Sequence, residues 1–186
     1  LWRDGQLVDV NAFDLTAPGM TLTGFGTVDG LDTAIEIDGE LSAQVADLSR
    51  FDALARQPLT GAINSDLVGK IALLTGAFDM DLTATGRDLG LGVPEIDAAL
   101  VGDSTLRITA VRNTEGLRLD RLDVLAGPLI VNGTVVLSAD WLPQTFRLNA
   151  GLESIDGAPV LVPLVDGDTR VGQAQIRAAF DAAQGD

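Results

Sequence analysis

The strongest constraint on the fold is an alternation of apolar and polar residues with a period of two. It runs without interruption from Phe78 to Thr85 and recurs at 35–41, 106–110 and 146–153. Because successive side chains of a strand point to opposite faces of a sheet, each segment has one apolar and one polar face. Long apolar runs, which are typical of parallel sheets covered on both sides, are rare in this chain. The pattern predicts an all-β protein.

The links between the expected strands are short and rich in glycine. Pro18-Gly19, Asp29-Gly30 and Gly127-Pro128 are typical of tight hairpins, because Gly accepts the positive φ that such turns need. Links of this length cannot contain the crossover helix that parallel strands require, so we expect an antiparallel, meandering sheet. A closed sandwich or small barrel, in which the apolar faces pack together, fits the same pattern. The expected strands lie near 6–16, 20–28, 34–42, 59–68, 77–86, 95–102, 104–112, 116–125, 129–138, 145–153, 158–164 and 170–180.

One segment departs from the alternation. Apolar residues of 43–57 recur at roughly helical spacing, and the segment ends before Pro58. Asp47 or Ser49 would cap such a helix. We expect a short helix near 43–57 that lies against one end of the sheet; the alternative is a lid or plug.

Two stretches of the chain align without a gap at an offset of 109 residues. Apolar positions coincide along this alignment, and after a two-residue slip it predicts an internal repeat of 8–42 and 117–153, with Ile37 matched to Leu148. Both units contain a step from even to odd apolar positions, at 10–13 and at 119–122, which indicates a β-bulge in each. Repeated units of this kind favour an elongated assembly that grows by adding strands.

Composition excludes several classes of chemistry. The 186 residues include no His and no Cys, which removes Ser-His-Asp triads, cysteine nucleophiles and metal sites built from imidazole or thiolate. The 12 Lys and Arg residues against 27 Asp and Glu residues leave a net charge of −15, which disfavours nucleic acid and anionic membrane surfaces as partners. We therefore expect no enzyme activity, no cofactor and no metal.

The carboxylates suit a solvated surface better than a catalytic site. Asp79 and Asp81, like Glu36, Asp38 and Glu40, stand at alternate positions of one strand face. Alternate residues are roughly 6.5–7 Å apart, close to the spacing of paired glycosidase carboxylates. Such pairs recur along the same face, as solvated residues do. Calcium binding at turns such as 167–168 stays an alternative, although the nine-residue repeat of calcium-binding β-rolls is absent.

The ends of the chain suggest a segment of a longer protein. Residue 1 is Leu, no signal segment follows it, and the chain stops just after an expected strand. The longest uncharged run, 124–139, is 16 residues long and contains Gly, Pro, Asn, Thr and Ser. That run is too short and too polar for a transmembrane helix.

The sequence Leu117-Arg-Leu-Asp-Arg-Leu-Asp-Val-Leu-Ala-Gly, followed by Val131-Asn-Gly-Thr-Val-Val-Leu, resembles the β-repeat region of the TamB and AsmA-like family. Residues 173–186 are also similar to it. The resemblance implies an elongated antiparallel sheet that curls into a U-shaped apolar trough (a β-taco), of which residues 1–186 are a single fragment. It also implies a periplasmic location in a diderm bacterium, as part of a protein anchored in the inner membrane. Such proteins conduct phospholipids between the inner and outer membranes and support outer-membrane biogenesis and protein secretion. Their partners are phospholipid acyl chains and, through other regions, a barrel of the outer-membrane assembly family.

The apolar positions of the expected strands are the candidate lining of such a groove. The runner-up function is an extracellular β-solenoid or adhesin-type structural segment, which predicts parallel coils of regular length. The candidate groove residues are Val8, Val10, Phe13, Leu15, Ile35, Ile37, Phe78, Met80, Leu82, Ile96, Ala98, Leu100, Leu106, Ile108, Leu117, Leu119, Leu122, Val124, Phe146 and Leu148.

Overall fold

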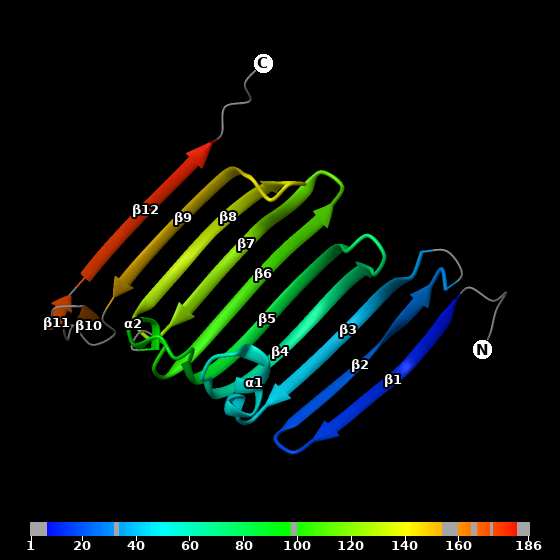
Figure 1. Ribbon diagram of the computed structural model, residues 1–186, viewed down its shortest axis with the longest axis horizontal. Coiled ribbons are helices and arrows are strands. Elements are labelled where there is room, and N and C mark those ends of the chain that lie inside the picture. Colours follow the sequence, from blue (N-terminus) through cyan, green and yellow to red (C-terminus); the bar gives the residue numbers. More distant parts are fainter. Residues whose placement is uncertain are drawn as a thin grey trace.

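The protein is built around one large antiparallel sheet. The computed structural model describes residues 7–31, 34–97, 100–153, 160–164, 167–171 and 173–181, with side chains as far as Gly151 except at 95 and 96. Ten strands follow one another across the sheet in the order β1 to β9 and then β12, and every neighbouring pair is antiparallel (Figure 1). Two short strands form a separate hairpin. The strands are β1 (Val8–Ala17), β2 (Met20–Asp29), β3 (Glu36–Val45), β4 (Thr60–Ala72), β5 (Ala77–Gly90), β6 (Asp103–Asn113), β7 (Gly116–Ala126), β8 (Leu129–Ser138), β9 (Pro143–Glu153), β10 (Val160–Leu164), β11 (Gly167–Val171) and β12 (Gln173–Asp181).

The sheet is open and curled. Its first and last strands, β1 and β12, do not pair with each other, so the ten strands do not close into a barrel. No second layer of strands packs on this sheet in the described part of the chain, apart from the β10–β11 hairpin at one edge. The predicted all-β, curled antiparallel sheet is confirmed, and the closed sandwich or barrel that fits the same alternation is not formed.

The short links produce the meander, as their sequences predict. Gly19 and Gly127, in the links that follow β1 and β7, have φ values of 78° and 49°, which a residue with a Cβ atom adopts only with strain. Each strand from β1 to β8 pairs with the next one along the chain, as tight links favour, whereas β9 pairs with β12. The connections from β3 to β4 and from β5 to β6 are longer and contain short helical turns.

The helix predicted at 43–57 is shorter in the structure than the helical spacing of its apolar residues suggested. β3 continues to Val45, and then a 3₁₀ turn (η1, Leu48–Phe51) and one helical turn (α1, Asp52–Ala55) follow. The Asp47 carboxylate accepts a hydrogen bond from the Ser49 backbone N–H at 3.0 Å, so Asp47 is the cap. No residue of either turn is buried, and α1 lies at an end of the strands (Figure 1). This placement agrees with a helix against the end of the sheet and not with a plug.

The strand expected at 95–102 is wrong. The segment instead begins with a single helical turn, α2 (Pro94–Asp97), within the connection from β5 to β6. β5 and β6 pair directly over ten registered positions, so no ladder position is left for another strand between them. The Asp97 carboxylate also accepts a hydrogen bond from the Leu91 backbone N–H at 2.6 Å, which ties the turn to the end of β5.

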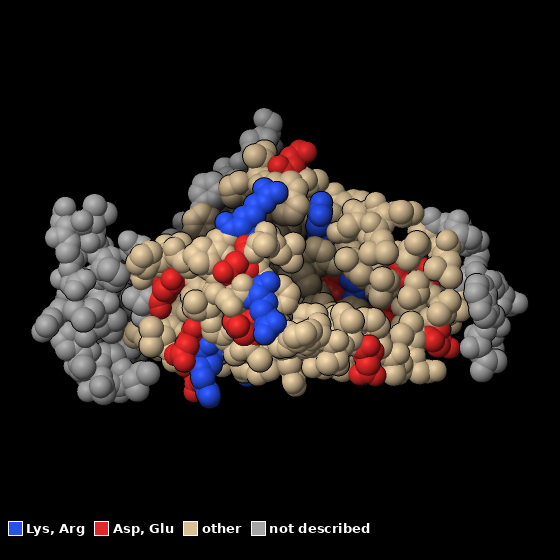
Figure 2. Space-filling view, turned by 60° about the horizontal axis from the view of Figure 1, so that its bottom comes forward, with Lys and Arg blue, Asp and Glu red and all other residues tan. Residues whose placement is uncertain are grey.

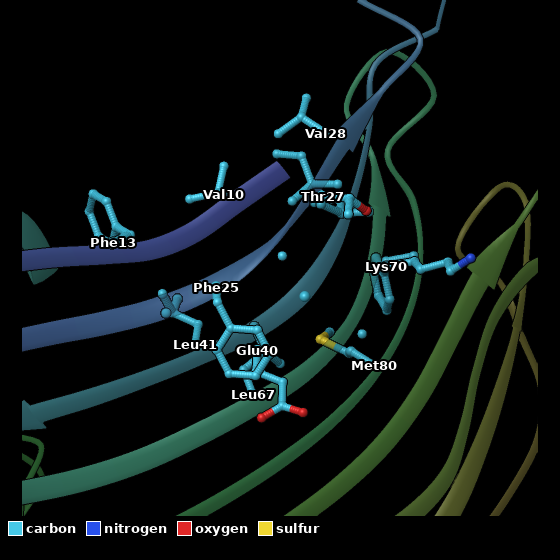
Figure 3. A pocket seen from close by; sticks show the side chains of 17 residues that line it. Val10, Phe13, Phe25, Thr27, Val28, Glu40, Leu41, Leu67, Lys70 and Met80 are labelled. Atoms are coloured by element: carbon cyan, nitrogen blue, oxygen red, sulfur yellow. The ribbon is translucent and has the colours of Figure 1, made fainter. Parts of the chain in front are cut away.

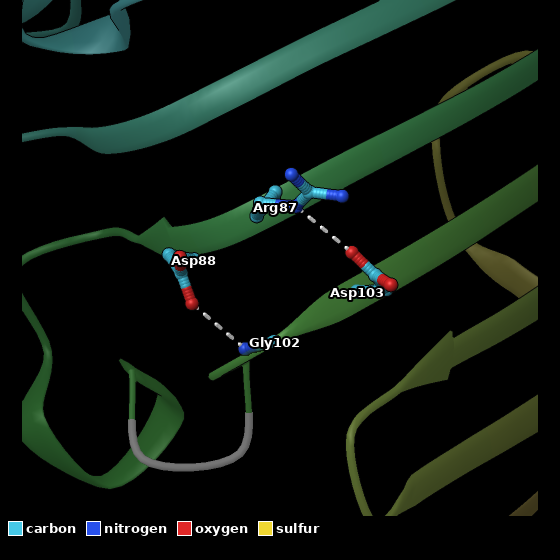
Figure 4. A network of polar contacts seen from close by, with 4 residues as sticks. All are labelled: Arg87, Asp88, Gly102 and Asp103. Atoms are coloured by element: carbon cyan, nitrogen blue, oxygen red, sulfur yellow. Dashed lines mark hydrogen bonds and ion pairs between the residues drawn. The ribbon is translucent and has the colours of Figure 1, made fainter.

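The base of this connection is fastened by polar contacts between β5 and β6. Asp88, with φ of 50°, accepts a hydrogen bond from the Gly102 N–H at 3.0 Å, and its own N–H donates to the Gly102 carbonyl at 2.9 Å. Arg87 and Asp103 form an ion pair at 3.1 Å beside it (Figure 4). Asn and Asp tolerate positive φ better than most residues, which suits Asp88 to this corner.

The end of the sheet also differs from the expectation. The single strand expected at 170–180 is two strands, β11 and β12, which belong to different sheets. β12 pairs with β9 over nine positions, and β10 with β11 form the separate hairpin. Alternation alone did not indicate this break, because both strands continue the same polar and apolar pattern.

Two β-bulges lie where the apolar positions change parity. The register of β1 shifts between Val10 and Phe13, and that of β7 shifts between Leu119 and Leu122. Both shifts were predicted from the sequence. A bulge adds an unpaired residue to one strand, which bends that strand and increases its twist.

In each case the strand next to the bulged one has a glycine opposite the first residue after the bulge. Gly24 in β2 and Gly133 in β8 occupy equivalent positions, and they pair in turn with Leu41 in β3 and Leu148 in β9. The alignment of the sequence had instead matched Ile37 with Leu148. The internal repeat of 8–42 and 117–153 stays a prediction, and in the third strand of each unit the residue opposite the glycine is Leu41 or Leu148.

Candidate functional site: an open apolar face

One face of the sheet consists almost entirely of apolar residues. Residues directly opposite each other in an antiparallel pair point to the same side, so the strand register sorts these residues into five rows that cross the sheet. We call this surface the apolar face. From β1 to β9, its first row is Val8, Val28, Ile37, Ile71, Phe78, Arg112, Leu117 and Leu137; the second is Val10, Gly26, Gly39, Gly69, Met80, Ala110, Leu119, Val135 and Phe146; the third is Phe13, Gly24, Leu41, Leu67, Leu82, Ile108, Leu122, Gly133 and Leu148; the fourth is Leu15, Leu22, Ala43, Ser65, Ala84, Leu106, Val124, Val131 and Ala150; and the fifth is Ala17, Met20, Val45, Ile63, Gly86, Ser104, Ala126 and Leu129.

Most of the candidate groove residues lie on this face. The exceptions are Ile35, which precedes β3, Ile96, which lies in α2, and Leu100, which lies in the connection before β6. Ala98 is outside the described residues. Three of these four belong to the segment 95–102 that was wrongly expected to be a strand.

Sequence reasoning missed the contributions of β2, β4 and β8. Leu22, Leu41, Leu67, Ile71 and Val131 all belong to the apolar face, although none was a candidate. A strand was expected at 59–68, and the alternation of Ile63, Leu67 and Ile71 with polar residues would have assigned these three to the apolar face. On β2 and β8 the glycines interrupt the apolar positions and weaken the signal.

The apolar face is not covered by another layer. Among the described side chains, only Ala84, Ala110, Ala126 and Ser104 are buried, and no large apolar side chain is fully buried. Phe13 and Leu15 are each 43% exposed, and Leu41 is 37% exposed. A globular domain ordinarily buries its large aliphatic residues, so a surface of this extent marks a site for an apolar ligand or partner.

The apolar face contains a pocket of about 330 Å³ between β1 and β5. Figure 3 shows Val10, Phe13, Leu41 and Met80 around it, and the Lys70 ammonium group directed away from it. The residues that line the pocket are Val10, Phe13, Gly24, Phe25, Gly26, Thr27, Val28, Ile37, Gly39, Glu40, Leu41, Leu67, Gly69, Lys70, Ile71, Phe78 and Met80. Its volume is at the small end of the range of ligand pockets, roughly 300–1,000 Å³.

The pocket exists because three consecutive strands have no side chain at the same level. Gly26, Gly39 and Gly69 follow one another across the second row, and we call them the glycine row. A Cβ atom on any of the three would overlap a backbone carbonyl oxygen of a neighbouring strand. Glycine there both opens the pocket and permits the close approach of the backbones. Glycines inside strands commonly mark such approaches and bends.

The opposite face of the sheet carries the charged and most of the polar residues, together with a few exposed apolar ones such as Phe25 and Val68. Lys70 forms an ion pair with Asp38 across β3 and β4 at 3.1 Å, and Asp81 accepts a hydrogen bond from the Thr109 hydroxyl at 2.6 Å. The hydrogen bond to Asp38 raises the pKa of Lys70, and the charges of Asp38, Glu36 and Asp79 raise that pKa further. The carboxylates expected on a solvated surface are all exposed: Glu36, Asp38, Glu40, Asp79 and Asp81.

With the exception of Arg112, the charged residues are therefore segregated from the apolar face. In Figure 2 the molecule is hollowed near its middle, and the visible wall of the hollow is mainly made of residues other than Lys, Arg, Asp and Glu. Among the described residues, no cluster of three or more Asp or Glu residues has the arrangement of a metal site. The possible calcium turn at 167–168 opens β11, whose side chains are outside the described set.

Comparisons of the chain with protein-family models, with curated proteins and with solved structures found no match. In the described part of the chain, no helix is long and apolar enough to cross a membrane. The candidate site is thus defined by its geometry: an uncovered apolar face with a glycine-lined pocket at one end.

Proposed function

We propose that this chain is a segment of a periplasmic, bridge-like protein whose apolar face carries phospholipid acyl chains between the inner and outer membranes. The observation that carries the proposal is the apolar face itself, which continues from β1 to β9 and is not covered by another layer. Water contact with so many aliphatic groups is unfavourable, and lipid tails would remove it.

The energetics suit transport of a lipid tail. Each methylene group that leaves water contributes about 0.8 kcal/mol, so a bound tail is held by many small contributions. Neighbouring rows present similar Leu, Val, Ile and Ala side chains. A tail can therefore move from one row to the next without a large change in free energy, because each position offers equivalent contacts.

The openness of the sheet supports entry and exit of the ligand. A closed barrel of alternating strands would pack its apolar side chains against each other, whereas this sheet ends at β1 and β12 without closure. The free edges of β1 and β12 also suit the addition of further strands, as in an elongated trough. An inner-membrane anchor, a barrel partner at the outer membrane and a role in outer-membrane assembly belong to the same proposal through the resemblance of 117–137 to the TamB and AsmA-like family.

The alternative is an extracellular β-solenoid or adhesin-type segment. A solenoid stacks parallel coils, whereas every pair of neighbouring strands in this sheet is antiparallel, and all of these pairs except β9 and β12 are consecutive along the chain. This observation disfavours the solenoid. No arrangement of residues in the described part of the chain favours an enzyme.

Photo-crosslinking tests the proposal. A photoreactive residue at Leu82 lies on the apolar face, and one at the adjacent Asp81 lies on the polar face of the same strand. We expect co-purified phospholipid to crosslink to position 82 and not to position 81. Equal labelling of both positions, or no labelling at either in a folded protein, would contradict lipid binding on the apolar face.

A further inference from the structure

Arg112 is the one charged residue in the five rows of the apolar face from β1 to β9. It lies in the first row, where its neighbours on the adjacent strands are Phe78 and Leu117. β6 ends one residue later, at Asn113, so Arg112 stands at the rim of the apolar face and is half-buried. An unpaired cation costs free energy in apolar surroundings, and such a position calls for an explanation.

The guanidinium group of Arg112 is held by an aromatic ring. Its central carbon lies 4.7 Å from the centre of the Trp141 ring, which belongs to the link between β8 and β9. Hydrogen bonds fix that link, with the Trp141 N–H donating to the Ser138 carbonyl at 2.9 Å. Gly76 is also close, since an added Cβ atom there would be 3.4 Å from an Arg112 Nη atom. A stacked guanidinium loses little further freedom when it binds an anion.

Arg112 lacks an acidic partner, unlike four of the other cations in the described part of the chain. Lys70, Arg87, Arg118 and Arg121 each form an ion pair with an aspartate within the described part of the chain. Over the same residues, no carboxylate and no hydrogen-bond acceptor contacts the Arg112 guanidinium, although the chain carries a net charge of −15. Its planar set of donors is available to an external anion.

We propose that Arg112, positioned by Trp141, binds the phosphate group of a phospholipid whose tail lies on the apolar face. This inference rests on the proposed function, because the tail supplies the reason for the headgroup to be at the rim. Guanidinium groups bind phosphate through two parallel hydrogen bonds, which makes Arg the preferred residue for this recognition. Trp141 suits the boundary between the lipid tail and its headgroup, because an indole ring has an apolar body and a polar edge.

The dimensions of the site agree with this placement. One leaflet of a bilayer contributes about 15 Å of hydrocarbon, which is half of a core about 30 Å thick. Strands rise about 3.4 Å per residue, so a tail that starts at Arg112 extends along β6 for roughly four residues. Over that span the apolar face presents Ala110 and then Ile108, with Leu82 beside Ile108 on β5. No other charged side chain of the apolar face lies in its way.

The test compares two lipids with the same tails on four forms of the protein. Dioleoyl phosphatidylethanolamine carries the phosphate and is neutral overall, and dioleoylglycerol lacks the phosphate. Native mass spectrometry in a nonionic detergent measures their binding to the wild type, Arg112→Gln, Arg112→Lys and Arg107→Gln. Arg107 is on the same strand as Arg112 but on the polar face, so its replacement is the matched control. Circular dichroism checks that each variant is folded.

We expect Arg112→Gln to weaken phosphatidylethanolamine binding by roughly tenfold and to leave dioleoylglycerol binding unchanged. Arg112→Lys should give a smaller loss, since a point charge replaces the two-pronged contact, and Arg107→Gln should bind as the wild type does. If Arg112→Gln does not fold, a loss with Arg112→Lys that is confined to the phosphate-bearing lipid still supports the inference.

Three other results would overturn it. Equal binding of phosphatidylethanolamine by all four forms would remove Arg112 from headgroup recognition while leaving the apolar face as the tail site. Absence of binding of both lipids to the wild type would instead remove the proposed function. Binding of inorganic phosphate alone that depends on Arg112, measured by calorimetry, would assign the site to a free anion.

Discussion

Gly39 and Gly69 lie directly opposite each other across β3 and β4, so the apolar face has no side chain at this point of two adjacent strands. Gly26 extends the gap to β2. The same absence of Cβ atoms lets the neighbouring backbones approach and leaves the pocket of about 330 Å³ above them. A feature of backbone packing and a feature of ligand binding thus have one cause.

Filling the pocket should block ligand binding. Met80 follows the glycine row on β5 and lines the pocket, so Met80→Trp places an indole in space that a ligand would use. We expect the affinity for an aliphatic ligand to fall by roughly tenfold or more, with the fold retained because the pocket accepts the added volume. Displacement of a fluorescent fatty acid measures the change. Val68→Trp, on the polar face of β4, is the control, and an equal effect of both variants would exclude the pocket as the site.

Replacement within the glycine row should destabilise the sheet. In Gly39→Ala, the new methyl group would overlap the carbonyl oxygen of Phe25 and approach Gly26 at 2.9 Å from its Cα atom. Relief requires movement of the backbone, which we expect to lower the free energy of unfolding by about 1–3 kcal/mol. Urea denaturation measures this value. Gln44→Ala, at an exposed position of the same strand, should change it far less; similar losses in both variants would show that close approach at Gly39 is unimportant.

A charge on the apolar face should prevent lipid binding without unfolding the protein. Leu82 is half-buried, so a glutamate in its place can still reach water in the free protein. A bound tail would have to desolvate that carboxylate, and we expect Leu82→Glu to lower lipid binding by at least about tenfold. In cells, lipid transport should fall while secretion is largely retained.

Thr83→Glu is the matched control for Leu82→Glu. Thr83 is the next residue of β5 and faces the polar side, where it pairs with Asp66 and Arg107. Binding to this variant should equal that of the wild type, as judged by recovery of phospholipid from the purified protein. A comparable loss in both variants would mean that added negative charge, and not its position on the apolar face, is responsible.

The cap of the short helical turns should respond to acid. Hydrogen bonds from the Ser49 hydroxyl and from its backbone N–H hold the pKa of Asp47 below its ordinary value of 3.8. A lowered pKa in the folded state means that the ionised cap stabilises the protein above the ordinary value and that this contribution is lost as the pH falls below it. The stability difference between the wild type and Asp47→Ala should therefore be present at neutral pH and shrink below pH 3.8. Urea titrations at several pH values measure it, and a difference that does not change with pH would contradict the assignment.

The local pattern of the sequence predicted the strands well where side chains alternate without interruption. The segment 78–85 is a strand with its apolar residues on one face, and the steps at 10–13 and 119–122 are bulges. The same reasoning failed at 95–102, because the alternation of Ile96 with Leu100 says nothing about whether a partner strand is free to pair. Direct pairing of β5 with β6 removes that partner.

The candidate site was predicted only in part for a related reason. Individual apolar residues such as Phe13, Leu82 and Leu106 could be assigned to one face, because a strand alternates about its own axis. The sequence could not predict that Gly26, Gly39 and Gly69 lie side by side in one row, since this depends on the register between three strands. The sequence of any single strand does not indicate the pocket, because the pocket forms only where glycines of neighbouring strands lie next to each other.

The sequence by itself determined that the chain forms antiparallel strands with an apolar and a polar side, because alternation and tight turns act over a few residues. Only the tertiary structure decided that the sheet stays open, that glycines of three strands form one row, and that Arg112 meets Trp141 at the rim of the apolar face. These features depend on register and curvature, which arise from pairing between distant residues and from bulges that bend several strands together.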